Sequence, residues 1–73
     1  MSYGEKAVGL SFNPGGDPMV EEIKSGYAKL INRMDEIRND PDSSSEKKWL
    51  ASIAITEAQT AQMWAVKAVT WKD

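Results

Sequence analysis

The sequence predicts an all-α protein: an N-terminal arm plus a two-helix antiparallel hairpin, assembled into a compact helical homo-oligomer. Two stretches with apolar residues at helical spacing flank a short polar connection, which predicts the hairpin. The chain has only 73 residues and no cysteine. Because one core of this size rarely stabilises a fold alone, we expect association with further copies of the chain.

The arm comprises residues 1–16, which contain four of the five glycines. Its apolar residues Val8, Leu10 and Phe12 alternate, but the run is too short and too interrupted by glycine to predict a strand. We expect an ordered arm that has room for one helical turn and ends in a turn at residues 13–16.

Residues 17–73 are predicted to form the hairpin domain, and its first helix spans about residues 18–39. Asp17 can accept hydrogen bonds from the first-turn N–H groups, and Pro18 suits the first helical position. Pro41 ends the helix, because the residue before a proline avoids the helical conformation. Gly26 would permit a close approach of another backbone. Steps of three and four residues predict a seam toward the second helix, formed by Val20, Ile23, Tyr27, Leu30, Met34 and Ile37.

Residues 42–45 form the predicted connection, and the second helix spans about residues 46–72. Its cap is either Ser43, which has capping-box spacing to Glu46, or Ser45. Residues 63–71 are apolar nearly all round, which is typical of a helix that is buried on every side. A hairpin partner covers only one side, so we expect other subunits to cover the rest. The tryptophans at 49, 64 and 71 are accordingly expected in the core or at an interface.

The composition excludes several kinds of chemistry. The chain has no histidine and no cysteine, which excludes Ser-His-Asp and Cys-His catalysis and zinc sites built from those ligands. The carboxylates are spread over helix surfaces, form no evident acid–base pair and lack the alternating spacing of a calcium loop. We therefore expect a protein that is not an enzyme and that holds no metal or other cofactor.

Charge and hydropathy restrict the partners. Nine basic and eleven acidic residues give a net charge of −2, which disfavours DNA binding. The sequence contains no run of about 18 apolar residues and no signal-peptide pattern, so we expect no membrane partner. Gly15 and Gly16 precede a helix as in a phosphate cradle, but Asp17 would itself occupy the N–H groups.

The arm carries residue types that bind nucleotides. Lysines bind phosphates, whereas aromatic rings and amides hold bases, and the arm contains Lys6, Phe12 and Asn13. Tyr3 adds a second ring. The alternative is that Phe12 and Leu10 only dock the arm on the hairpin, with Lys6 in solvent.

Two lysines on the predicted helices lie among apolar neighbours, namely Lys24 and Lys67. A lysine in such a position either extends to the rim of the apolar surface or faces a ligand pocket at a subunit boundary. The sequence leaves both possibilities open for each of them.

Several stretches of the chain resemble a known family. Residues 49–51 (WLA) and 56–69 (TEAQTAQMWAVKAV) look like the second helix of the phage anti-CBASS sponge proteins. The stretch from Gly4 to Lys6, the pair Ile23-Lys24 and residues 28–31 (AKLI) are similar to the first half of those proteins. The related anti-Thoeris sponges share the same two-helix module.

The resemblance implies a specific function. Such proteins bind and sequester cyclic oligonucleotide second messengers without cleaving them, in the cytoplasm of the infected bacterial host, and so block activation of CBASS effectors. The resemblance also implies compact hexamers that bind cyclic dinucleotides such as 3′,3′-cGAMP at boundaries between paired subunits. The resemblance further implies that cyclic trinucleotides can bind where three subunits meet.

The resemblance also implies ligand contacts for particular residues. Lys6 would neutralise a phosphate, Gly4 would let backbone approach it, and Tyr3 would stack on a base. Lys47, beside Lys48, would reach a trinucleotide site, whereas Val8 departs from a position where members can have a small hydroxyl side chain. The complete set of predicted ligand-binding residues is Tyr3, Gly4, Lys6, Val8, Phe12, Asn13, Pro14, Lys24 and Lys47.

Two other functions compete with the sponge. The first is a structural or protein-interaction hairpin, such as a small phage assembly factor, which the apolar residues 63–71 would favour. The second is an enzyme that cleaves the same messengers, which the lack of an evident acid–base pair disfavours.

Overall fold

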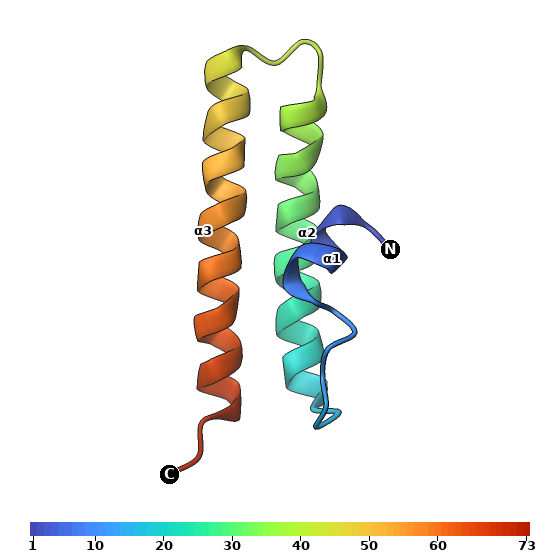
Figure 1. Cartoon of the computed structure of the whole chain (residues 1–73), viewed down its shortest axis with the longest axis vertical. Coiled ribbons are helices and arrows are strands. Elements are labelled where there is room, and N and C mark those ends of the chain that lie inside the picture. The colour runs from blue at the N-terminus through green and yellow to red at the C-terminus, as the bar shows by residue number, and fades with distance from the viewer.

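The computed structural model describes all 73 residues and contains three helices, α1 (Tyr3–Val8), α2 (Pro18–Asn39) and α3 (Ser45–Thr70). The two long helices lie side by side and are joined by a short connection at one end, and α1 packs across the middle of α2 (Figure 1). The all-α hairpin that the sequence predicts is therefore confirmed. Its radius of gyration of 13.6 Å exceeds the roughly 11 Å typical of a compact chain of this length.

Both ends of α2 follow the local sequence signals. The Asp17 side chain accepts a hydrogen bond from the Met19 backbone N–H at 2.9 Å, and Pro18 occupies the first turn. At the other end, Asp40 is the C-terminal cap and its N–H donates to the Ile37 carbonyl at 3.3 Å. Pro41 follows immediately, which agrees with the expected end of the helix.

The start of α3 differs from both alternatives considered above. Ser44 is the cap, and its hydroxyl accepts from the Lys47 backbone N–H at 3.1 Å. Neither Ser43 nor Ser45 is the cap, because Ser43 still lies in the connection and Ser45 is already helical. The helix ends at Thr70, so Trp71 and Lys72 lie beyond it.

The arm contains a complete six-residue helix with its own caps. The Glu5 N–H donates to the Ser2 hydroxyl at 3.1 Å, while the Ser2 N–H donates to the Glu5 carboxylate at 2.7 Å, which together form a capping box. The bond from the Ser2 backbone and the contact with its hydroxyl lower the pKa of Glu5. Gly9 ends the helix with a left-handed φ of 63°, which glycine adopts without strain.

A small core lies where the three helices meet. It consists of Val8, Ala28, Ile31 and Ile55. Leu30, which the sequence places in the helix–helix seam, is 61% exposed. The predicted seam is wrong at Leu30. Helix α2 packs against both α1 and α3, so its buried residues lie on the face of α2 that points between these two helices. These buried residues are Val20, Lys24, Ala28 and Ile31.

Much of the apolar surface of α3 is uncovered in the single chain. Trp49, Trp64 and Trp71 are all exposed, so none of the three tryptophans belongs to the core. Leu50 and Met63 on the same helix are exposed as well. No helix combines the length and the apolar character that a membrane crossing requires.

Candidate ligand-binding site

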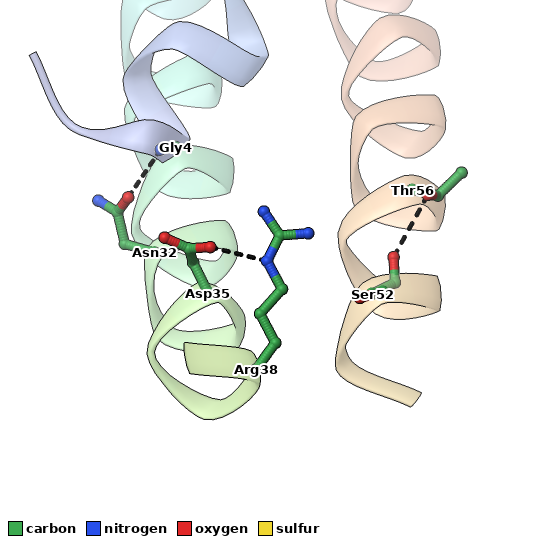
Figure 2. Close-up of polar contacts among 6 residues, drawn as sticks. All are labelled: Gly4, Asn32, Asp35, Arg38, Ser52 and Thr56. Atoms are coloured by element: carbon green, nitrogen blue, oxygen red, sulfur yellow. Dashed lines mark hydrogen bonds and ion pairs between the residues drawn. The ribbon is translucent and has the colours of Figure 1, made fainter. Parts of the chain in front are cut away.

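The arm is fixed to α2 at Gly4. The Gly4 N–H donates to the Asn32 side-chain oxygen at 2.7 Å, and Figure 2 shows the Asn32 side chain directed toward it. The Asn32 amide nitrogen donates in turn to the Ser2 hydroxyl at 3.1 Å. A Cβ at position 4 would collide with the Ala28 carbonyl oxygen, so only glycine fits. The close backbone approach expected at Gly26 occurs here instead, since Gly26 has no atom near its missing Cβ.

A second contact holds the start of α1. The Arg38 guanidinium lies over the Tyr3 ring, 4.7 Å from its centroid. It also donates to the Asp35 carboxylate at 2.8 Å, as Figure 2 shows. Hydrogen bonding to Tyr3 and to Asp35 raises the pKa of Arg38 above its ordinary value. The Tyr3 ring therefore already has a cationic partner within the chain.

Lys24 fixes the segment that follows α1. It is only 5% exposed, and its ammonium donates to the backbone carbonyls of Gly9, at 3.0 Å, and of Phe12. The ammonium also lies 5.6 Å from the centre of the Phe12 ring. Lys24 therefore fits neither of the two possibilities that the sequence left open, because it neither extends to a solvated rim nor presents a free cation to a pocket. Its charge is instead satisfied by the arm backbone.

An open groove of about 780 Å³ lies between the arm and α3, and we call it the α1–α3 groove. Its volume is in the range of small-molecule sites, which is roughly 300–1,000 Å³. The arm contributes the exposed Lys6 and the 73% exposed Phe12. The facing wall comes from α3 and consists of Thr56, Gln59, Thr60, Gln62, Met63 and Val66.

A second groove of about 580 Å³, the C-terminal groove, lies between the turn that ends the arm and the end of α3. Asn13 shapes this turn, because its amide donates to the Asp17 carbonyl at 2.9 Å and accepts from the Asp17 N–H at 3.3 Å. Phe12, Pro14 and Trp71 line the groove beside it. Nearby, Lys67 is exposed with its ammonium 5.3 Å from the Trp64 ring centre.

The structure brings together only part of the set predicted to bind ligand. Lys6, Val8, Phe12 and Lys24 line the α1–α3 groove, and Phe12, Asn13, Pro14 and Lys24 line the C-terminal groove. Tyr3 and Gly4 lie instead in the contact between α1 and α2. Lys47 lies in the first turn of α3, at the end of the molecule that carries the connection (Figure 1).

Sequence reasoning missed the amides that face the arm. Gln59 donates from its side chain to the Ala7 carbonyl at 3.4 Å, and Gln62 is only 6% exposed. The signal was present in the sequence, since the two glutamines are three residues apart and so share a face of the helix. Asn32 was missed because its partner, Gly4, lies 28 residues away.

The sequence model of the family described as "Acb2/Tad1, hairpin domain" matches residues 5–70 of the chain. The chain belongs to this family. The match includes α2, α3 and most of α1, and it confirms the resemblance to the phage anti-CBASS and anti-Thoeris sponges. Neither the curated proteins nor the solved structures gave a match. Membership in the Acb2/Tad1 hairpin family implies a non-catalytic protein that binds cyclic nucleotides as a sponge does.

The two grooves are lined mainly by cationic, aromatic, amide and apolar side chains. No group of three or more carboxylates lies close enough together to hold a metal ion. The two grooves contain one carboxylate between them, that of Asp17, and this carboxylate caps α2. An Acb2/Tad1 hairpin built in this way offers cations, rings and amides to a ligand.

Proposed function

We propose that the chain is a phage sponge that binds and sequesters cyclic oligonucleotide second messengers without cleaving them. The ligands in this proposal are cyclic dinucleotides such as 3′,3′-cGAMP, and also cyclic trinucleotides. The protein acts in the cytoplasm of the infected bacterial host, where lowering the free messenger keeps CBASS effectors inactive. The observation that carries the proposal is the family match over residues 5–70.

The α1–α3 groove supports Lys6 as the phosphate-binding residue. Lys6 is exposed at the groove and forms no ion pair within the chain, so its ammonium is free for a ligand phosphate. Phe12, in both grooves, offers a ring face to a base. The remaining predicted contacts stay predictions, and they are Tyr3, Gly4, Val8, Asn13, Pro14, Lys24 and Lys47.

The proposal includes assembly into a homo-oligomer, with the hexamer as the expected state. The exposed Trp49, Met63 and Trp64 on α3, with Trp71 just beyond it, support it, because several large apolar side chains exposed along one helix are typical of a surface that a partner covers. A two-fold subunit boundary would also supply Lys6 twice, once for each phosphate of a cyclic dinucleotide. Light scattering tests this part, and a mass near 8.1 kDa would contradict it.

The function is tested by calorimetric titration of the full chain with 3′,3′-cGAMP, followed by chromatography of the ligand released by heat. Tight binding and recovery of intact ligand are the expected results. Recovery of a linear product would contradict a sponge and favour the hydrolase instead. Parallel titrations with a cyclic trinucleotide establish the ligand range.

The second candidate is a protein-interaction hairpin without a nucleotide ligand. The observation that favours it is the same exposed apolar surface of α3, which a different protein could cover. This candidate becomes the better explanation when the purified chain gives no heat with any cyclic di- or trinucleotide.

A further inference from the structure

A buried amide without a partner faces the α1–α3 groove. Gln62 is 6% exposed, and its side chain forms no hydrogen bond within the chain. No side-chain nitrogen or oxygen is fully enclosed without a partner, so both amide atoms of Gln62 retain access to space outside the protein. Gln62 lines the α1–α3 groove, which supplies that space. Because the amide atoms of this largely buried residue have no partner in the chain and can be reached from the groove, they are available to pair with a ligand.

The other polar side chains of the groove, apart from Lys6, each form at least one hydrogen bond within the chain. Gln59 donates to the Ala7 carbonyl, and Lys24 donates to the arm carbonyls. The hydroxyls of Thr56 and Thr60 donate to carbonyls one turn earlier in α3, as Figure 2 shows for the bond from Thr56 to Ser52. Apart from the exposed Lys6, Gln62 is therefore the polar side chain of this groove that forms no hydrogen bond within the chain.

The surroundings of Gln62 suit a flat aromatic ligand. Val8, Met63 and Val66 give the groove apolar walls, and Phe12 lies at its edge with an exposed ring. A glutamine amide presents one donor and one acceptor side by side. The N6 and N7 edge of adenine presents the complementary pair, whereas the corresponding edge of guanine presents two acceptors and leaves the amide oxygen unpaired.

We propose that the α1–α3 groove is an adenine-binding pocket and that the side-chain amide of Gln62 reads the N6–N7 edge of the base. This inference rests on the proposed sponge function and deepens it by naming the base that the groove selects. Lys6, at the same groove, is then placed to bind a phosphate of the nucleotide whose base is in the pocket.

The test is calorimetric titration of the full chain with cyclic di-AMP and with cyclic di-GMP. We expect the wild-type chain to bind the adenine ligand more tightly. Gln62→Met keeps the length and volume of the side chain but removes both amide atoms. It should weaken cyclic di-AMP binding by about ten- to a hundredfold and change cyclic di-GMP binding by less than about twofold. Gln59→Met is the matched control, and it should affect both ligands equally.

Each result decides the proposal. A wild-type chain that binds both ligands equally, or a Gln62→Met variant that keeps the adenine preference, overturns the adenine pocket and leaves the sponge function standing. Binding of neither these ligands nor any other cyclic nucleotide overturns both. If Gln62→Met loses helical content, NMR of the wild-type Gln62 side-chain amide replaces it. A shift on addition of cyclic di-AMP supports the pocket, and an unchanged signal overturns it.

Discussion

The backbone N–H of Gly4 and the side-chain oxygen of Asn32 lie 2.7 Å apart, and this hydrogen bond joins the arm to the middle of α2. At the same point the missing side chain of Gly4 lets α1 approach the Ala28 carbonyl. The position of the whole arm, including Lys6, therefore depends on a residue with no side chain and on an amide 28 residues later.

Gly4→Ala should destabilise the chain by about 1–3 kcal/mol, because the added methyl group meets the Ala28 carbonyl and forces α1 away from α2. Urea denaturation followed by circular dichroism measures the change. Gly26→Ala is the matched control. Its added methyl group meets nothing within 4 Å, so improved helix propensity should stabilise the chain by up to about 1 kcal/mol. Equal shifts for the two variants would contradict the close contact at Gly4.

Lys24→Met should release the segment between α1 and α2, because the carbonyls of Gly9 and Phe12 lose their shared donor. Hydrogen exchange of the backbone amides of residues 9–16 should become faster, and stability should fall by about 1–3 kcal/mol. Lys29→Met removes an exposed lysine of the same helix and should change stability by less than about 0.5 kcal/mol. Unchanged exchange in residues 9–16 of Lys24→Met would show that the lysine does not hold this segment.

Lys6→Ala should weaken binding of a cyclic dinucleotide by about tenfold or more, because it removes a charge-assisted bond to phosphate. The exposed position of Lys6 predicts little change in thermal stability. Calorimetric titration gives the dissociation constant, and Lys29→Ala serves as a control for the loss of one positive charge. An unchanged dissociation constant for Lys6→Ala would remove this residue from the site.

The capping box of α1 should make part of the stability depend on pH. Hydrogen bonds from Ser2 lower the pKa of Glu5 in the folded chain below its value in the unfolded chain. The stabilisation is therefore fully present above the unfolded pKa, near 4.5, and is lost as the pH falls through the lower folded pKa.

Urea midpoints at pH 7 and pH 3 measure this loss. Glu5→Gln keeps an acceptor for the Ser2 N–H but does not titrate, so its midpoint should fall less than that of the wild type over the same interval. Identical pH dependence in the two proteins would argue against the contribution of Glu5.

The elements that local signals specify were predictable, and those that depend on distant contacts were not. Asp17 and Pro18 start α2, and Pro41 ends it, through interactions within a few residues. The seam, in contrast, includes Leu30 only if α3 is the sole partner of α2. In the structure α1 is a second packing partner of α2. The helix α1 begins at a capping box formed by Ser2 and Glu5, a local pattern that the composition of the arm does not reveal.

The candidate site shows the same division. Residue type alone singles out Lys6 and Phe12 as candidates, because a cation and a ring are the groups that bind phosphates and bases, and their role stays a prediction. Gln62 could not be identified from the sequence. It becomes a candidate only because the fold buries most of its side chain beside the arm and leaves its amide without a partner in the chain. Tyr3 and Gly4 were chosen for a ligand, yet within the chain their partners are Arg38 and Asn32.

The exposure of all three tryptophans has a spectroscopic consequence. They lie along α3 from near its start, at Trp49, to its C-terminal cap, Trp71, and none is enclosed by the chain itself. Fluorescence from an isolated chain therefore originates from hydrated rings, whereas any protein surface laid over α3 dehydrates them. The emission maximum should shift to shorter wavelengths as the protein concentration rises through the point of association. Tryptophan fluorescence therefore measures the covering of α3 on association without an added label.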